Sequence, residues 1–422
     1  MLVGYIILNA VFILISFKYY KRIVNPIIIY SIVWLLAIFI HQSGIIHYNE
    51  FLLRTWLFII CSYMCFCVSC LAYKQSKLRH VVSEFNDDMY KKELNKYLII
   101  TLSIASLGIL SSIYNIISIY GTNLIYNITN VYAARVNEDM DFQVIPYVGS
   151  FLYISLPLAG IYVKRYGVSI WVMYAFALVA LNSLTSGARA GIVFSLLLFV
   201  YGYIVCSSDH TIKKRNGRSN MGLYVGALIL LFFFIFISQK RAAGNELPYA
   251  TDMFYKYFGG NVMLYKTFAY IANPIGVLNE YLQECNFFFG KNTLLPVYNI
   301  LAKFGLMGRI EQYQGWYNIP APCNVGTWLR ELSEDFTWVG ALVFISIFAY
   351  ITSKEFMKSL KTHSTSSIVV TSILLMIVTL SFFDWKLRTS GIWIALAFGF
   401  LIGNKIDKSL RNNGRHIDIK LQ

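Results

Sequence analysis

Long apolar runs alternate with short polar connections along most of this chain of 422 residues. A helix that crosses a bilayer needs about 20 predominantly apolar residues, and eleven runs come close to that length. The pattern therefore predicts an all-α polytopic membrane protein with about eleven transmembrane helices. The predicted segments are 2–17, 23–41, 56–73, 97–118, 144–163, 167–184, 191–206, 222–239, 337–352, 366–383 and 389–403.

One connection is far longer than the others. It spans 240–336 and holds five of the eight prolines, which mark turns and helix ends. Its apolar stretches 275–282 and 294–304 are too short to cross a bilayer, so we expect short interfacial or re-entrant helices there. The chain is expected to divide into a membrane bundle at 1–239, a large extracytoplasmic loop at 240–336, a second bundle at 337–403 and a basic tail at 404–422.

Composition and charge agree with a membrane location. Apolar residues make up 57% of the chain and charged residues 14%, about half the charged share of a soluble domain. The net charge of +15 is concentrated in alternate connections and in the tail, and Lys and Arg are retained on the cytoplasmic side. This predicts a periplasmic N-terminus and a cytoplasmic C-terminus, with no nucleic-acid partner. No positive residue precedes the first apolar run, so we expect it to be a span and not a cleavable signal peptide.

Three positive residues lie at the extracytoplasmic boundary of the membrane, on the side where Lys and Arg are not usually retained, and they need an explanation. Arg189 occupies the tight connection 185–191, and Lys240 and Arg241 follow the eighth apolar segment. A cation at such a boundary is unfavourable unless it faces a cavity or an anion. Snorkelling into lipid headgroups or interfacial anchoring is the alternative. We treat all three as candidate substrate-binding residues.

A polar segment, 324–336, leads into the ninth apolar run. If it is helical, Thr327, Arg330, Glu331 and Glu334 share one face, because side chains three and four residues apart are neighbours on a helix. A cation and carboxylates would then meet at the membrane surface. The alternative is a set of local ion pairs that contribute little to stability.

Two more segments add candidate binding groups. The stretch 313–318, with Tyr313 and Trp316, suits either stacking on sugar rings or an aromatic belt. The tight connection 384–388 ends in Arg388. Arginine grips phosphate oxygens with two parallel hydrogen bonds, so a lipid diphosphate would satisfy a cluster of such residues. We expect convergence of Arg189, Arg241, Arg330 and Arg388 on one site.

Several other kinds of chemistry have no support in the sequence. The chain lacks a Walker A motif, which excludes ATP-driven transport, and it lacks the His-Glu-x-x-His and Gly-x-Ser-x-Gly motifs. We predict no metal site and no cofactor. Cys285 and Cys323 both fall in the large loop, and a disulfide between them is left open.

The layout, with one large outer loop in the C-terminal half, resembles bacterial O-antigen and oligosaccharide repeat-unit polymerases. The run Asn324–Arg330, followed by Glu334-Asp335-Phe336 and a span, looks like the segment that closes the large loop in that family. The run Ser186–Gly191 at the head of a span is similar to another recurring family feature. The arginine-x10-glycine pattern of some members is absent, because Val200 and Ala341 occupy the glycine positions after Arg189 and Arg330.

The resemblance implies an integral-membrane glycosyltransferase of lipopolysaccharide biosynthesis in the bacterial inner membrane. It would move a growing glycan from undecaprenyl diphosphate onto the next lipid-linked repeat unit, with a chain-length regulator as a possible partner. Arg330 would stabilise the charge of the diphosphate. Glu331 or Asp335 would accept the proton of the acceptor hydroxyl, and Asn324 and Thr327 would orient sugar hydroxyls. The stereochemical course, the sugars and the oligomeric state stay open.

Two rival functions remain. A lipid-linked oligosaccharide flippase would transport the same substrate without making a bond, but flippases tend to have more spans, short loops and two similar halves. An O-antigen ligase has a similar layout but places an essential histidine in the large outer loop. None of the six histidines lies in 240–336, which argues against a ligase.

Overall fold

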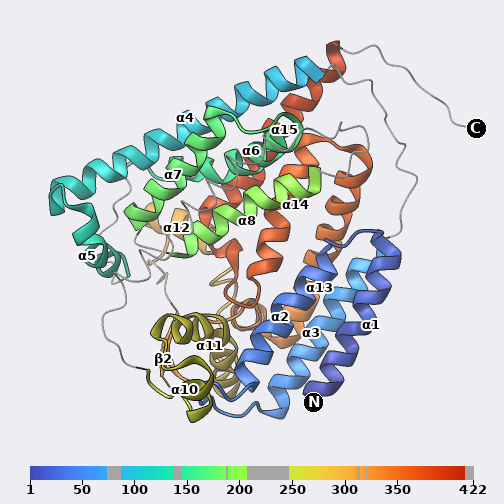
Figure 1. Cartoon of the computed structure of the whole chain (residues 1–422), viewed down its shortest axis with the longest axis vertical. Coiled ribbons are helices and arrows are strands. Elements are labelled where there is room, and N and C mark those ends of the chain that lie inside the picture. The colour runs from blue at the N-terminus through green and yellow to red at the C-terminus, as the bar shows by residue number, and fades with distance from the viewer. Residues whose placement is uncertain are drawn as a thin grey trace, which may run out of the picture. The chain divides into compact units, whose positions relative to one another are not determined.

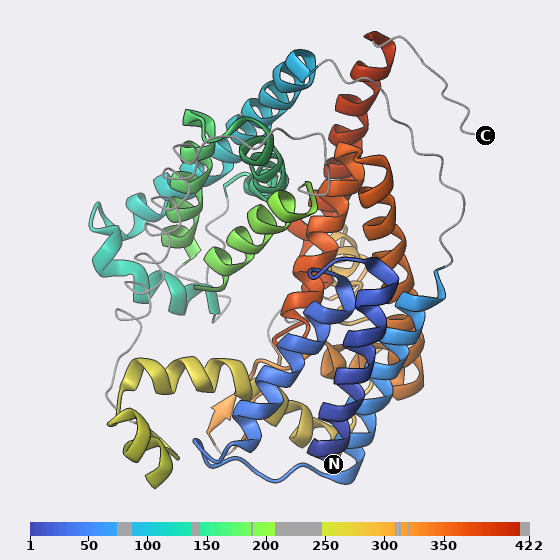
Figure 2. The ribbon, with the colours of Figure 1, turned by 45° about the vertical axis from the view of Figure 1, so that its right-hand side comes forward.

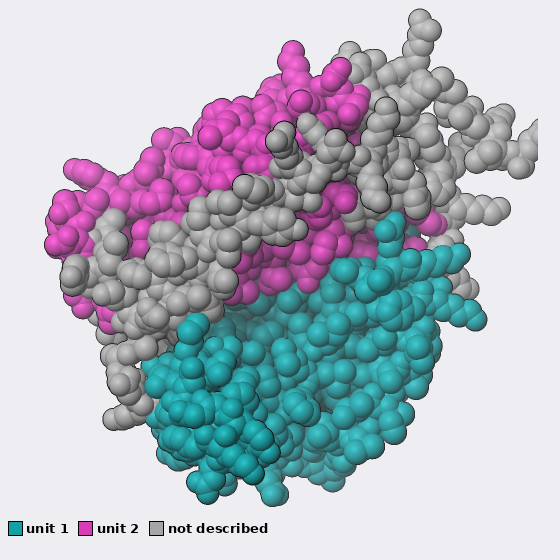
Figure 3. Space-filling model, in the orientation of Figure 1, with its two compact units in different colours: residues 1–75, 244–354, 377–390 teal, residues 76–243, 355–376, 391–422 magenta. Residues whose placement is uncertain are grey.

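The computed structural model describes residues 1–73, 87–136, 144–186, 189–206, 247–308, 310, 314–319 and 321–413. These residues are mostly helical. They belong to two compact units, which Figure 3 shows in teal and magenta. The first unit comprises 1–75, 244–354 and 377–390, and the second comprises 76–243, 355–376 and 391–422.

The first unit is built on three helices that pack side by side, α1 (Leu2–Tyr20), α2 (Pro26–Gln42) and α3 (Leu53–Ala72), as Figures 1 and 2 show. Helix α2 starts where the sequence places an N-cap followed by proline: the Asn25 side chain accepts a hydrogen bond from the Ile28 N–H, and Pro26 occupies the first turn. Its other described elements are α10 (Asp252–Phe258), α11 (Val262–Glu284), α12 (Leu295–Lys303), β1 (Tyr317–Asn318), β2 (Pro322–Cys323), α13 (Trp328–Thr362) up to residue 354, the end of α14 (Thr365–Leu380) and the 3-10 turn η3 (Lys386–Arg388).

Aromatic packing fixes the start of α13 against α2 and α3. The Trp328 ring is fully buried and lies 5.5 Å from the Tyr30 ring and 6.1 Å from the Phe66 ring. Such ring contacts contribute about 0.5–1.5 kcal/mol each beyond burial of their area. The charged residues that follow Trp328 are therefore held on a rigid support.

Helix α13 changes character at Thr337. This residue has φ 64° inside an otherwise continuous helix, a conformation that is strained for a β-branched side chain. The segment 328–336 before it carries the charges, and the apolar run 337–352 after it is the predicted span. The kink separates a charged segment from the part of α13 that is apolar enough to cross a membrane.

The second unit contains helices that approach one another closely. Its described elements are α4 (Asp87–Tyr120), α5 (Leu124–Val136), η1 (Val148–Phe151), α6 (Leu152–Tyr166), α7 (Ile170–Ser186), α8 (Arg189–Cys206), most of α14 (Thr365–Leu380) and of α15 (Ser390–Asn413), and the end of α13. A Cβ atom at Gly160 of α6 would lie 2.3 Å from the Phe199 carbonyl oxygen, and one at Gly202 of α8 would lie 2.5 Å from the Pro157 carbonyl oxygen. Small residues that admit a neighbouring backbone are typical of helix packing in membranes.

The structure agrees with the predicted class of helical membrane protein. Within the described part of the chain, α1, α3, α4 and α13 are long and apolar enough to cross a bilayer, and shorter apolar helices match other predicted segments. The number of eleven spans stays a prediction, and the segment 222–239 lies outside the described residues. The predicted connection after residue 118 contains a helix, α5, that the apolar pattern did not indicate.

Candidate functional site

Charged side chains are buried together in the first unit, around the start of α13. Arg330 is 3% exposed, Glu331 is 1% exposed, and Asp335 is fully buried. Lys386, in the turn η3, is 4% exposed. Charged residues are almost never fully buried unless they are paired, so each of these needs partners.

The Arg330 guanidinium lies between an amide and two aromatic rings. Its Nη1 donates to Gln314 Oε1, and its central carbon lies 4.9 Å from the Tyr317 ring and 5.7 Å from the Tyr281 ring. Rings at this distance attract a cation through their π faces. Two buried donors here, Arg330 Nε and Gln314 Nε2, have no hydrogen-bond partner among the described residues. They match what an oxygen-rich anion or ordered water would accept.

Gly326 gives the Arg330 side chain its room. A Cβ atom at this position would lie 2.4 Å from Arg330 Cδ and 3.3 Å from Gln314 Oε1. No real Cβ atom tolerates the first distance, so any larger residue would displace the arginine. The run Asn324–Arg330 thus requires a glycine at position 326 for steric reasons.

Glu331 uses only part of its hydrogen-bonding capacity. Its Oε1 lies 3.4 Å from Arg388 Nη1, whereas its Oε2 has no hydrogen-bond partner among the described residues. Because Glu331 precedes the kink at Thr337, it lies outside the apolar span. Burial raises the pKa of its carboxyl well above the ordinary value, and the positive charge of Arg388 opposes that rise.

Asp335 has both oxygens occupied. Its Oδ1 accepts from the Asn292 N–H at 2.7 Å, and its Oδ2 accepts from the Thr293 N–H at 2.7 Å and from Thr293 Oγ1 at 2.6 Å. Thr293 Oγ1 in turn accepts from Trp385 Nε1 at 2.9 Å. Asp335 therefore ties the turn at 291–293 and the segment 384–388 to α13.

Two further ion pairs border the centre. Lys291 Nζ lies 3.0 Å from Glu334 Oε1, and Lys386 Nζ lies 2.5 Å from Asp384 Oδ2. Burial lowers the pKa of Lys386, and the adjacent Asp384 opposes that change. Lys386 and Asp384 form one ion pair and Arg388 and Glu331 another, and Asp384 is close enough to act electrostatically on the Glu331 carboxyl.

The structure brings together some of the residues that the sequence singled out. Arg330, Glu331, Asp335 and Arg388 lie in this one centre. Thr327 is buried at the start of α13, where its Oγ1 accepts from the Arg330 N–H at 3.4 Å, so it caps the helix. Asn324 is half-buried in the segment before it.

Other candidates do not join the centre in the described structure. Trp316 is 65% exposed. Arg189 begins α8 in the second unit, and its side chain is not described. Tyr313, Lys240 and Arg241 lie outside the described residues. The expected convergence of four arginines stays a prediction, although Arg330 and Arg388 both belong to the centre.

The sequence reasoning missed several partners of these charges. Asn292 and Thr293 follow Lys291 as a short polar run between apolar stretches, and that run was a usable signal. Tyr281, whose ring contacts Arg330, looks like any aromatic residue of an amphipathic helix. Gln314 and Tyr317 lie in the stretch 313–318, but nothing in the sequence paired them with Arg330.

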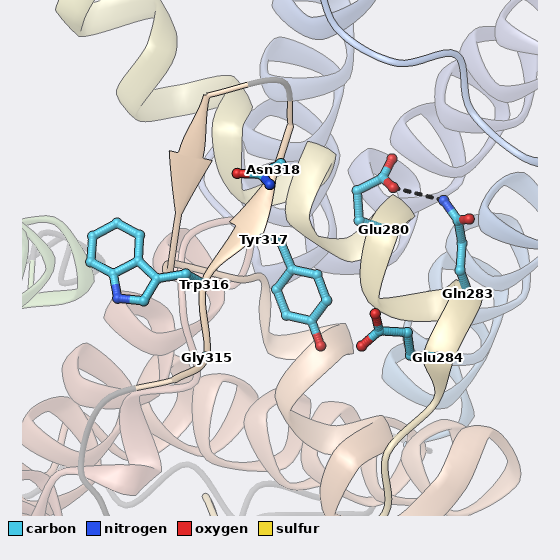
Figure 4. A pocket seen from close by; sticks show the side chains of 7 residues that line it. All are labelled: Glu280, Gln283, Glu284, Gly315, Trp316, Tyr317 and Asn318. Carbon is cyan, nitrogen blue, oxygen red and sulfur yellow. Dashed lines mark hydrogen bonds between the residues drawn. The ribbon is translucent and has the colours of Figure 1, made fainter.

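An open cleft lies beside this centre, and Figure 4 shows its lining. It has a volume of about 460 Å³. The lining comes from the end of α11 and from the strand β1 with the residues before it: Glu280, Gln283, Glu284, Gly315, Trp316, Tyr317 and Asn318.

Cysteines and metal ligands add nothing to the centre. Cys285 and Cys323 are both free thiols, so the disulfide that the sequence left open is not formed. In the part of the chain that the structure describes, no group of three or more His, Cys, Asp or Glu side chains is placed to hold a metal ion.

Comparison with protein-family models, with curated proteins and with solved structures finds no match to this chain. Fold and site together define only a class: a helical membrane protein whose largely buried centre contains arginines, together with a carboxylate oxygen and hydrogen-bond donors that have no partner among the described residues.

Proposed function

We propose that this protein is an O-antigen polymerase. It transfers a growing glycan from undecaprenyl diphosphate to the next lipid-linked repeat unit, at the periplasmic face of the bacterial inner membrane. The observation that carries the proposal is the meeting of segments 324–336 and 384–388, where the buried residues Arg330 and Glu331 lie in one centre with the half-buried Arg388. The resemblance of 324–336 to the loop-closing segment of these polymerases points the same way.

The chemistry of the donor asks for cations and hydrogen-bond donors. When the anomeric carbon leaves the diphosphate, negative charge grows on the phosphate oxygens, and preorganised donors stabilise it. Arg330 Nε and Gln314 Nε2 are buried donors that lack partners among the described residues. They hold the diphosphate in our proposal, and the contacts of Arg330 with Tyr281 and Tyr317 keep its guanidinium in place.

Glu331 is the better of the two candidate bases. Asp335 already accepts hydrogen bonds at both oxygens, so it serves as a positioning residue for the turn at 291–293. Glu331 Oε2 is free of such bonds in the described structure. A carboxylate with a raised pKa is an effective proton acceptor near neutral pH.

The step balances as a substitution at the anomeric carbon. The acceptor hydroxyl oxygen forms a bond to the anomeric carbon of the donor glycan, and its proton passes to Glu331. The bond between that carbon and the diphosphate oxygen breaks, and its electron pair stays on the departing undecaprenyl diphosphate. Arg388, 3.4 Å from Glu331, holds the carboxylate in position.

A surface-polysaccharide gel tests the proposal. In a strain that lacks the gene, the ladder of long chains is expected to collapse to a band with a single repeat, and the intact gene is expected to restore it. The Arg330→Ala variant is expected to give only the single-repeat band at normal protein level. A lipid core without any repeat would point instead to a flippase or a ligase. A normal ladder in the deletion strain or in the variant would overturn the proposal.

A further inference from the structure

The cleft beside the charged centre is lined by two carboxylates, and none of the described residues that line it is a cation. Glu280, Gln283 and Glu284 come from the last turns of α11, and Tyr317 and Asn318 come from β1. Figure 4 shows the Tyr317 ring pointing toward Glu284, while the Trp316 indole lies on the opposite side of the strand. A volume of about 460 Å³ is within the ordinary range for sites that hold small molecules.

The two glutamates of the cleft differ in the hydrogen bonds that they accept. Glu280 Oε1 accepts from Asn49 Nδ2 at 3.0 Å, and its Oε2 accepts from Gln283 Nε2 at 2.7 Å. Glu284 is exposed and forms no hydrogen bond or ion pair with the described residues. The wall therefore has one carboxylate that already accepts hydrogen bonds and one that is free to accept them from O–H or N–H groups of a ligand.

Tyr317 joins the cleft to the charged centre. Its ring lies 4.9 Å from the Arg330 guanidinium, and it lines the cleft close to Glu284. A molecule in the cleft therefore lies next to the arginine that holds the diphosphate in the proposed function. A carboxylate on that molecule would meet Glu280 and Glu284 at short range, where like charges repel.

We propose that this cleft binds a sugar residue whose polar groups are hydroxyls or amines, and that its acidic wall rejects uronic acids. The inference rests on the proposed function for the origin of the sugar, which is the lipid-linked repeat unit. Within that reaction, the cleft selects neutral or amino sugars beside the diphosphate. Hydroxyl and amine groups donate to Glu284, and the phenol ring of Tyr317 offers an apolar face to the sugar ring.

Direct binding tests the inference without any transfer reaction. The full-length protein in lipid nanodiscs is titrated calorimetrically with three probes of equal length, the trimers of N-acetylglucosamine, glucosamine and galacturonic acid. We expect the first two to bind and the third to bind at least about tenfold more weakly, because its carboxylates are repelled by Glu280 and Glu284. The preference is expected to shrink at high salt, because the wall is exposed to solvent.

A matched pair of variants assigns the preference to the wall. Glu284→Gln is expected to weaken the glucosamine trimer about tenfold and to strengthen the galacturonate trimer, because it removes a free carboxylate of the wall. Asp252→Asn, an exposed acid of α10 in the same unit, is expected to leave all three affinities unchanged.

Three results would overturn the inference: equal affinity for the galacturonate trimer, no binding of the other two, or unchanged affinities in Glu284→Gln. Chain length in the Arg330→Ala strain reports on the proposed function alone. Loss of polymer there together with indiscriminate trimer binding would reject the acidic cleft and keep the polymerase. A normal ladder together with selective trimer binding would reject the polymerase and keep the acidic cleft.

Discussion

Two carboxylates, one in each compact unit, show how the hydrogen bonds that a carboxylate already accepts help to identify a reactive group. Asp407 of α15 accepts the Thr365 N–H at 2.8 Å with Oδ1 and the Ser366 N–H at 3.2 Å with Oδ2. Glu331 is buried, whereas Asp407 is half-buried. One Glu331 oxygen lies 3.4 Å from Arg388 Nη1, and the other has no hydrogen-bond partner among the described residues. The first carboxylate caps a helix, and the second keeps one oxygen available to accept a hydrogen bond.

The two units also differ in how the helices inside each of them pack. In the second unit, α6 and α8 meet through Gly160 and Gly202, so their backbones touch and no side chain intervenes. In the first unit, the start of α13 carries charged side chains into the interior and surrounds Arg330 with Tyr281 and Tyr317. Close backbone packing contributes stability, whereas buried charge is weak evidence for stability and needs another explanation.

The largest effect is expected from Arg330→Lys. Lysine keeps the charge but loses the planar fork and the contact with two aromatic rings, so the rate of glycan transfer is expected to fall about 1,000-fold. The measurement is transfer by the purified protein, with lipid-linked repeat units extracted from the deletion strain. Arg54→Lys in α3, a half-buried arginine of the same unit, serves as the control. Transfer within a factor of two of the wild type would remove Arg330 from the reaction.

Replacing Glu331 separates chemistry from folding. Glu331→Gln is expected to lower the transfer rate about 100-fold, because the amide cannot accept the proton. The melting temperature is expected to change little, since Oε2 has no partner to lose among the described residues. Burial raises the pKa of Glu331, so its ionised form grows as pH increases through that raised value. Wild-type transfer is therefore expected to rise with pH across the neutral range, and a profile of the same shape in Glu331→Gln would contradict this role.

Replacing Asp335 is expected to have the reverse effect of replacing Glu331: stability falls and the transfer chemistry is kept. Asp335→Asn replaces one of the two acceptor oxygens by an NH2 group, so a buried donor of Asn292 or of Thr293 loses its acceptor and the free energy of unfolding is expected to fall by about 2–4 kcal/mol. Thermal unfolding of the purified protein in detergent measures this change. The protein that remains folded is expected to transfer glycan with the pH profile of the wild type. A variant of normal stability with no transfer would make Asp335, and not Glu331, the base.

The sequence anticipated the helices and part of the centre for clear physical reasons. Apolar runs of membrane length form helices because backbone groups in lipid must bond within their own segment. Arg330, Glu331 and Asp335 stood out because charges next to a predicted span need an explanation. The helix α5 escaped notice because its 13 residues mix polar and apolar side chains without a span-like run.

The rest of the centre depends on contacts that sequence spacing does not contain. Asn292 lies 43 residues before Asp335, and Gln314 lies 16 residues before Arg330. In the sequence, Glu331 and Asp335 are equivalent carboxylates one helical turn apart. Only the position of the turn at 291–293 shows that Asp335 is already occupied and that Glu331 Oε2 is free.

A substitution at Gly326 tests whether the backbone at this position confines the Arg330 side chain. Gly326→Ala places a Cβ atom 2.4 Å from Arg330 Cδ, and relieving this overlap is expected to cost about 1–3 kcal/mol of stability. Transfer is expected to fall as well, since the guanidinium moves away from Gln314. Gly308→Ala is the matched control, because a Cβ atom there meets nothing within 4 Å. Equal melting temperatures for the two variants would show that Arg330 is not confined by this glycine.

The smallest effect is expected at Asp407, and it closes the comparison with Glu331. Asp407→Ala removes the acceptor for the first N–H groups of α14, which is expected to lower the free energy of unfolding by about 0.5–2 kcal/mol. The transfer rate of the folded protein is expected to stay unchanged, because this carboxylate has no oxygen left for substrate. Thermal unfolding and the transfer assay are run on the same preparation. Loss of transfer at normal stability would mean that a fully bonded carboxylate can still take part in the reaction, and hydrogen-bond occupancy would then no longer distinguish Glu331 from Asp407.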